Sequence, residues 1–286
     1  MTRNAPSRPY ARLLSRLAAP VLIGLLAASF AVPATASAAD LTISQAEQLM
    51  VDLLNANRKA AGLVPVQVDS RLMEIARARS TDMATQHYFS HSQPDGRNVF
   101  DILNARHITW YGAGEIIAWN TWGTLADSAT SASKQWHDSS AHYALLTSAN
   151  YNYFGVGLAV DDTGKKIWTV VFMKGPDRTG ARARFRTSSN VAAGAVTTAS
   201  TGGRKDVTIK WSGSDVRLQV LTAGLKYFQV QVRVEGRYDW RDTKSSTTST
   251  SMVRSLVKGR VYQFRIRAKD KAGNYGRWSE TLWIRP

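Results

Sequence analysis

All five histidines of the chain lie between residues 87 and 142, and the only glutamate between them is Glu115. Imidazole is the commonest metal ligand and general base in proteins, so we look for chemistry in this stretch. We select His91, Glu115 and His142 as the candidate site. Two neutral imidazoles and one carboxylate can hold zinc or another divalent cation with one position open. They can equally act as a base and an acid on a water molecule.

The spacing of these residues leaves metal binding and acid–base catalysis open, together with a purely structural interpretation. In the structural interpretation, His91 and His142 form hydrogen bonds to backbone groups at helix ends, and Glu115 caps a strand. Nucleophilic catalysis has no support, because no serine lies in a Gly-x-Ser-x-Gly turn and the chain has no cysteine. The run Phe-Gly-Val-Gly at 154–157 predicts a close-packed strand rather than a phosphate loop, since no Lys-Ser/Thr follows it.

Short motifs surround the candidate residues along the chain. They are His-Tyr-Phe-Ser-His-Ser at 87–92, Pro-Asp-Gly-Arg at 94–97, Gly-Glu-Ile-Ile-Ala at 114–118, Trp-His-Asp-Ser-Ser-Ala-His at 136–142 and Phe-Gly-Val-Gly at 154–157. Their order and spacing resemble the CAP superfamily, named for cysteine-rich secretory proteins, insect venom antigens and plant pathogenesis-related proteins, over residues 44–173. The resemblance implies an α-β-α sandwich in which histidines and acidic residues from distant segments converge on one cleft. The selection of His91, Glu115 and His142 rests on this resemblance, because they stand at the matching positions. It also implies the lipid binding reported for some members.

The chain departs from the animal and plant members of that family at the site. Those members usually carry a glutamate three residues after the helix tryptophan, where this chain has Ser139 after Trp136. They also carry a further histidine on the following strand, where Tyr151 and Tyr153 stand, and an asparagine where Ile116 stands. This incomplete set of site residues favours a binding protein over an enzyme. If the protein is an enzyme, we expect a hydrolase.

Helical and strand periodicities indicate what positions the site. Ser44 and Glu47 form a capping-box pattern before apolar residues at helical spacing that stop at Gly62, and Asp69 caps a second helix that ends near His87. Further helices are expected at 98–106 and 124–137, and strands at 114–118, 153–160 and 166–173. Trp110, Tyr111, Trp119 and Trp122 surround Glu115 in sequence; they either belong to the core or line a groove for a sugar, an acyl chain or a sterol.

The first 39 residues have the pattern of a secretory signal peptide. Four arginines precede an apolar run at 17–32, and Ala-Ser-Ala at 36–38 is a small-residue cleavage site. The run is short for a membrane span and no stop-transfer segment follows it. We therefore expect a secreted, extracellular protein with no transmembrane segment.

Charge divides the remaining chain into two parts. Residues 40–175 carry 11 Lys+Arg against 13 Asp+Glu, net −2, whereas residues 176–286 carry 22 against 8, net +14. Such asymmetry predicts a domain boundary. We expect a CAP domain at 40–175, a linker or the first strand of a second domain at 176–203, and a second domain at 204–286.

The second part is predicted to be all-β, so that the whole chain is of the α+β class. Segments 206–211, 227–234, 261–268 and 281–284 alternate with period two. Leu256-x-x-Gly259-x-x-Tyr262 and the strand after it resemble a fibronectin type III domain with its tyrosine corner, and Trp211 matches the inward tryptophan of an early strand. The resemblance implies an immunoglobulin-like (fibronectin type III) sandwich.

The outward faces of these strands are cationic. Arg265, Arg267 and Lys269 share one face of their strand, and Arg233 lies on the outward face of another. They predict either a surface for anionic cell-wall or extracellular polymers, without specific nucleic-acid recognition, or a solubilising charge coat. As surface charges they are expected to contribute little to stability.

Three functions remain open. The first is a secreted CAP protein acting as a binding or interaction module, whose cleft takes a metal or a small amphiphile such as a lipid. The second is a metal-dependent or acid–base hydrolase of wall polymers or peptides. The third is an adhesion protein in which the basic second domain binds the cell envelope and the CAP domain is a platform.

Overall fold

The computed structural model describes residues 40–186 and 195–286. The predicted signal peptide and residues 187–194 of the predicted linker lie outside the described residues. Within the described ranges, no helix is both long enough and apolar enough to cross a membrane.

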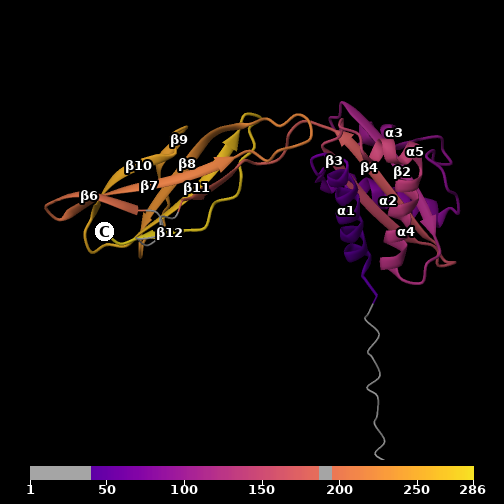
Figure 1. Ribbon diagram of the computed structural model, residues 1–286, viewed down its shortest axis with the longest axis horizontal. Coiled ribbons are helices and arrows are strands. Elements are labelled where there is room, and N and C mark those ends of the chain that lie inside the picture. Colours follow the sequence, from indigo (N-terminus) through magenta and orange to yellow (C-terminus); the bar gives the residue numbers. More distant parts are fainter. Residues whose placement is uncertain (1–39, 187–194) are drawn as a thin grey trace, which may run out of the picture. The chain divides into compact units, whose positions relative to one another are not determined.

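The N-terminal part is built on one mixed four-stranded sheet with the order β1-β3-β4-β2 (Figure 1). The strands are β1 (Gln67–Val68), β2 (Gly112–Asn120), β3 (Tyr153–Val160) and β4 (Lys166–Lys174). β1 runs parallel to β3, while β3, β4 and β2 pair antiparallel, so β2 forms one edge of the sheet. The helices are α1 (Ile43–Ala60), α2 (Ser70–Thr85), α3 (Val99–Ala105), α4 (Leu125–Asp138) and α5 (Ser140–Leu146).

Helices cover both faces of this sheet, as predicted. Successive side chains of a strand point to opposite faces, and β2 shows this directly. Ile116 and Ala118 pack in the core that α1 and α4 cover, together with Met50 and Trp136. Ile117 packs on the other face, with Met83 of α2. Glu115 is two residues before Ile117 and therefore shares the α2 face of the sheet.

The helix boundaries were largely predictable from their caps, with one correction at α1. Asp69 accepts a hydrogen bond from the backbone N–H of Arg71 and caps α2, and Gly62 with φ +74° follows the end of α1, both as predicted. The capping box of α1 is formed by Thr42 and Gln45, whose side chains each bond the other's backbone N–H. The predicted pair Ser44 and Glu47 was wrong, because Glu47 is buried and bonds Arg77 instead.

Two glycines let α2 lie directly on β3. A Cβ at Gly155 would come within 2.1 Å of the Leu72 backbone, and one at Gly157 within 2.2 Å of the Ala76 backbone. The Phe-Gly-Val-Gly run is therefore a strand that a helix approaches at backbone distance, as its sequence predicted. The approach fixes where the functional side chains of α2 stand relative to the sheet.

The C-terminal part is β-rich, with antiparallel sheets (Figure 1). One sheet has the order β10-β7-β5, with β6 also pairing β7, and the other has the order β12-β11-β8-β9. The strands are β5 (Arg182–Phe185), β6 (Ala195–Thr201), β7 (Arg204–Ser214), β8 (Leu225–Val234), β9 (Arg241–Thr247), β10 (Ser251–Val257), β11 (Tyr262–Asp270) and β12 (Leu282–Ile284).

Both sheets contribute to one apolar core in this part. Trp211 of β7 is fully buried and meets Phe228 of β8 edge to face, with ring centroids 6.3 Å apart. The Tyr262 hydroxyl accepts a hydrogen bond from the backbone N–H of Val257 at 3.1 Å. Strands β7, β8, β11 and β12 were predicted. β5 and β6 lie within 176–203, where either a linker or a first strand was expected, and β9 and β10 were missed.

Candidate functional site

The site is organised by a buried ion pair between α2 and β2. Arg79 of α2 donates from Nε to Oε1 of Glu115 at 2.9 Å, and the two side chains are 1% and 3% exposed. Glu115 is on the sheet face that α2 covers, so its carboxylate meets the helix rather than solvent. A buried carboxylate needs such a partner, because an uncompensated charge inside a protein is strongly unfavourable.

The same arginine ties the segment after α2 to the sheet. Its NH1 donates to the Tyr88 hydroxyl and its NH2 to the Ser90 carbonyl, both at 2.7 Å. Burial alone would lower the pKa of Arg79, but the hydrogen bond and negative charge of Glu115 outweigh burial and raise it. Tyr88 in turn donates to Asp82 at 2.5 Å, and burial together with this bond raises the pKa of Tyr88 to about 12. Arg79 is thus a fixed cation that holds the His91 segment in place.

His91 is the accessible member of the site. Its Nδ1 lies 2.8 Å from Oε2 of Glu115, and its side chain is 55% exposed. An ionised carboxylate can only accept, so Nδ1 carries the proton, and in the neutral form of the imidazole Nε2 presents a lone pair. A carboxylate that orients an imidazole in this way is the arrangement found both behind metal-bound histidines and in acid–base catalysis.

His142 lies on α5, a short helix that the sequence did not predict. Its Nδ1 lies 2.9 Å from Oγ of Ser139. Burial, and secondarily the charge of His91, lower the pKa of His142 below its ordinary value. His91 follows α2 in the chain, whereas His142 lies on α5.

The three predicted residues do not form one compact metal shell. Among the described residues, two groups of His, Asp and Glu have ligand atoms within 4.8 Å of one another, and His91, Glu115 and His142 are not one of them. Both oxygens of Glu115 are already engaged, Oε1 by Arg79 and Oε2 by His91. In this arrangement Glu115 positions His91, the Nδ1 atoms of both imidazoles are hydrogen-bonded, and metal binding by the three residues stays a prediction.

Arg79 is the residue that sequence reasoning missed. Leu72, Ile75 and Ala76 form the buried stripe of α2, and Arg79 continues that stripe at helical spacing. A charge on a buried stripe requires an opposite charge across the interface. The position of Arg79 on the buried face of α2 was therefore the sequence signal that it pairs with a buried carboxylate such as Glu115.

The two compact groups of potential ligands lie elsewhere. His87, Asp161 and Asp162 form one group in the N-terminal part, in which His87 and Asp162 are exposed and the side chain of Asp161 is 2% exposed. Asp177, Asp215 and Asp270 form a largely buried group whose oxygens accept backbone N–H bonds from Thr179, Ala223, Gly224 and Asn274. Burial, and after it the charges of Asp177 and Asp270, raise the pKa of Asp215. The backbone bonds give these carboxylates a structural role in holding three loops together.

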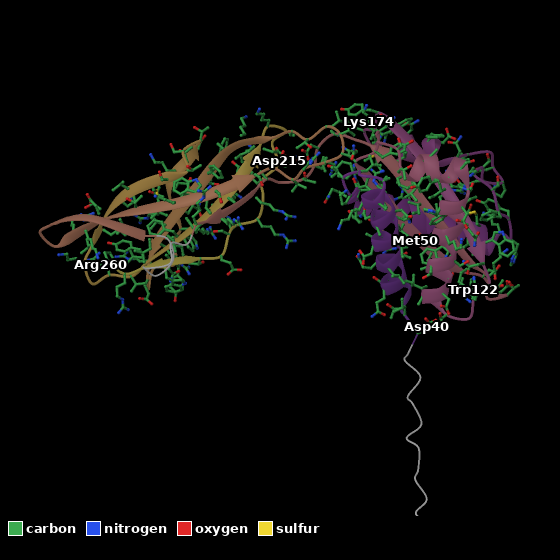
Figure 2. The ribbon with its side chains drawn as sticks, viewed as in Figure 1. Asp40, Met50, Trp122, Lys174, Asp215 and Arg260 are labelled. Atoms are coloured by element: carbon green, nitrogen blue, oxygen red, sulfur yellow. The ribbon has the colours of Figure 1, made fainter. Side chains whose placement is uncertain are left out.

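The aromatic residues around Glu115 in sequence are divided between core and surface. Trp110 packs on Phe100, with ring centroids 5.8 Å apart. Trp119 and Trp122 are 47% and 54% exposed, and they line a surface pocket with Gly123, Ser131 and Gln135. Trp122 belongs to the connection between β2 and α4 (Figure 2). The pocket combines these two exposed rings with polar side chains at the surface of the N-terminal part.

The predicted cations of the C-terminal part lie on two neighbouring strands. Arg265, Arg267 and Lys269 alternate along β11, and Arg233 lies on β8, which pairs with it. Each is half-buried and stacked on aromatic rings. Because stacked cations stabilise a fold by more than solvated ones, we expect these side chains to contribute more to stability than surface charges usually do.

Known proteins resemble the N-terminal part of the chain. YkwD of Bacillus subtilis (strain 168) is 33% identical over 139 residues, which make up 49% of this chain and 51% of YkwD. The membrane protein YlbC of the same organism is 31% identical over 128 residues, 45% of this chain and 34% of YlbC. The chain thus spans about half or less of the length of these relatives.

Solved structures and a family model cover the same region. An extracellular protein containing an SCP domain from Bacillus anthracis is 27% identical, with a TM-score of 0.40 and coverage of 46% of this chain and 41% of that one. A cysteine-rich secretory protein from Staphylococcus aureus is 18% identical, with a TM-score of 0.38 and coverage of 46% and 39%. Residues 51–172 match the model of the CAP family, the cysteine-rich secretory protein family, and this match supports a CAP domain in the N-terminal part.

Proposed function

We propose that this chain is a secreted CAP-domain protein of the cell envelope or extracellular space that acts as a binding or interaction module. Its His/Glu cleft takes a divalent cation or a small amphiphile, and its basic C-terminal part attaches it to anionic polymers. The observation that carries the proposal is the state of Glu115, which Arg79 neutralises and which orients His91. A site arranged in this way presents imidazole nitrogens to a ligand without an accessible carboxylate.

The metal form of this proposal involves two protein ligands. Nε2 of His91 and a nitrogen of His142 are the donors, and zinc accepts imidazole nitrogen readily. With Glu115 committed to Arg79, such a site binds zinc more weakly than a site with three protein ligands. The exposed Trp119 and Trp122 support the amphiphile form, because they provide apolar surface in the same domain.

Zinc titration and elemental analysis of the purified full chain test the cleft. The double variant His91→Ala, His142→Ala should lose zinc binding, whereas the control His107→Asn, His137→Ala, which removes as many imidazoles, should keep it. Equal zinc binding by both variants would exclude a metal in the cleft. Displacement of a fluorescent fatty acid then tests the amphiphile form. Loss in the His91→Ala, His142→Ala variant would place the amphiphile in the cleft, and loss in Trp122→Ala alone would place it in the tryptophan pocket.

One observation favours a hydrolase as the second candidate. The Glu115–His91 pair has the geometry of an oriented general base, and His91 is accessible to a water molecule. Hydrolysis of a wall polymer or peptide that disappears in His91→Ala and persists in His107→Asn would favour this candidate. Adhesion through the basic part alone is the third candidate, and the cationic stacking on β8 and β11 supports it.

We further propose that the C-terminal part is an immunoglobulin-like sandwich of the fibronectin type III kind. Its N-terminal boundary lies before the expected residue 204, because β5 and β6 pair with β7. The shared core of two antiparallel sheets and the Tyr262 hydroxyl bond to Val257 support this assignment. Independent folding of residues 176–286, which include β5 and β6, measured by circular dichroism, tests the domain boundary.

A further inference from the structure

Cationic and aromatic side chains alternate in one continuous stack across β8 and β11, which we call the cation ladder. The guanidinium carbon of Arg265 lies 4.4 Å from the ring centre of Trp240 and 4.3 Å from that of Trp278. The guanidinium carbon of Arg267 lies 4.6 Å from the ring centre of Trp278 and 4.0 Å from that of Tyr275. The ends of the ladder are Arg233, over Trp240, and Lys269, over Tyr275 and Tyr227.

A second layer fixes the edges of the arginines. Nε and NH2 of Arg265 both donate to Oε1 of Gln231, at 2.8 and 2.6 Å, and Nε of Arg267 donates to Oε1 of Gln229 at 2.7 Å. Both glutamines donate their amide N–H to Asp242, each at 2.9 Å. The carboxylate therefore sets the orientation of both amides, so that their oxygens face the guanidinium groups.

The ladder has N–H donors and positive charges that no protein group satisfies in the described residues. Within residues 40–186 and 195–286, no carboxylate forms an ion pair with Arg233, Arg265, Arg267 or Lys269. Burial lowers the pKa of Arg265, and the charges of Arg233 and Arg267 lower it further. A guanidinium has five N–H donors, and the contacts of Arg265 with protein acceptors use two of them. The ladder is thus an array of like charges held at fixed positions, with N–H groups still available to an anion.

The aromatic faces of the ladder are already in use. Arg265 and Arg267 are two residues apart on β11, about 7 Å, so a ring within 4.6 Å of both lies between them. Trp278 is therefore not free to stack on a base or a sugar, and Trp240 already contacts two guanidinium groups as well. Recognition at this surface must come from charge and from N–H edges.

We propose that the cation ladder binds a linear phosphodiester polymer of the polyol-phosphate kind. The inference rests on the proposed attachment of the basic part to anionic polymers, and it names the binding residues and the class of polymer. Guanidinium forks bind phosphate oxygens with two parallel N–H bonds and are more weakly hydrated than ammonium groups. The strand repeats its cations every 7 Å or so, which suits a chain whose phosphates are joined by a three-carbon polyol. A polymer without bases does not need aromatic rings to stack on, so its binding is not weakened because the rings already contact arginines.

Three variants of the full chain separate the ladder from general charge. The ladder variant is Arg265→Gln, Arg267→Gln, Lys269→Gln. The control variant, Lys210→Gln, Arg254→Gln, Lys258→Gln, removes the same charge from the other sheet and its turn. The fork variant, Arg265→Lys, Arg267→Lys, keeps the charge and removes the guanidinium forks together with their planar stacking. The probes are poly(glycerol phosphate), polygalacturonate of matched charge number, and oligothymidylate.

We expect wild-type affinity for poly(glycerol phosphate) to fall steeply between about 50 and about 200 mM salt, as counterion release requires. The ladder variant should lose about tenfold or more in affinity, the control variant about threefold or less, and the fork variant an intermediate amount. If circular dichroism shows that the ladder variant does not fold, the affinity of the fork variant for poly(glycerol phosphate), compared with that of the control variant, tests the proposal instead.

Other outcomes overturn the assignment. Equal losses in the ladder and control variants would show that the cations are a charge coat. Polygalacturonate bound as tightly as poly(glycerol phosphate) would remove the preference for phosphate, and oligothymidylate bound about tenfold more tightly would indicate a nucleic-acid partner. A wild-type chain that binds none of the three probes would instead refute the proposed attachment itself.

Discussion

At the scale of single residues, the site depends on one buried pair of opposite charges. Removing Arg79 leaves Glu115 buried without its cation, and breaking a buried pair costs about 3–5 kcal/mol. We therefore expect Arg79→Met to lower the free energy of unfolding by about that amount in urea denaturation. The double variant Arg79→Met, Glu115→Leu should regain most of the loss, since apolar groups of similar volume replace a buried pair at little cost. A double variant as unstable as the single one would contradict this account.

The titration of His142 is a second property at this scale. Its pKa is lowered in the folded chain, so the unfolded chain binds more protons once the pH falls through the ordinary histidine value of about 6.5. Stability contributed by neutral His142 is therefore present above that pH and is lost on acidification below it. In NMR titrations, we expect His91→Gln to raise the pKa of His142 only partly toward its ordinary value, because the burial of His142 still lowers it. The control His107→Asn, at a backbone φ of 51° that asparagine tolerates, should leave it unchanged.

At the scale of elements, the site is placed by the close approach of α2 to β3. An added Cβ at Gly157 would overlap the backbone of Ala76, which cannot move without shifting the helix that carries Arg79. Gly157→Ala should therefore lower the free energy of unfolding by about 1–3 kcal/mol or more and weaken the Arg79–Glu115 contact. Gly123→Ala, which meets nothing within 4 Å, is the matched control. Equal stability of the two variants in urea would mean that α2 can move away from β3 freely.

The cation ladder also acts at this scale, because it links β8 and β11 through side chains. Cation–π contacts contribute about 0.5–2 kcal/mol each, depending on solvent exposure. We expect the ladder variant Arg265→Gln, Arg267→Gln, Lys269→Gln to have a lower thermal midpoint than the control Lys210→Gln, Arg254→Gln, Lys258→Gln. Calorimetry of both proteins measures the difference, and coincident midpoints would show that the stacking adds nothing to stability.

At the scale of the whole molecule, the two parts of the chain differ in their response to salt. Residues 176–286 carry a net charge of +14 and residues 40–175 a net charge of −2. The Debye length falls from about 30 Å at 10 mM salt to about 8 Å at 150 mM, so salt screens repulsion within the basic part. Hydrogen exchange followed by mass spectrometry should show that added salt protects amides of β8 and β11 and changes those of β3 and β4 little. Equal effects in both parts would contradict this expectation.

Most of the elements and the faces they bury were predictable from sequence. Periodicity located α1 to α4, β2 to β4 and the strands of the C-terminal core, because those signals are local: caps such as Asp69, glycines such as Gly157 and alternating apolar residues. The resemblance located His91, Glu115 and His142, and the model matching residues 51–172 agrees with it over the same region. Local signals were weak for α5 and for the polar strands β5, β9 and β10, which their neighbours stabilise.

Only the tertiary structure decided what the selected residues touch. Arg79 and Glu115 are far apart in sequence and meet because β2 pairs with β4, while α2 lies on the same face of that sheet. Trp240 and Trp278 join Arg265 in one stack for the same reason, since strand pairing brings distant segments to one face. Contacts of this kind depend on sheet order and helix placement, which hydrophobic burial fixes for the whole domain at once, so no single segment of the sequence carries them.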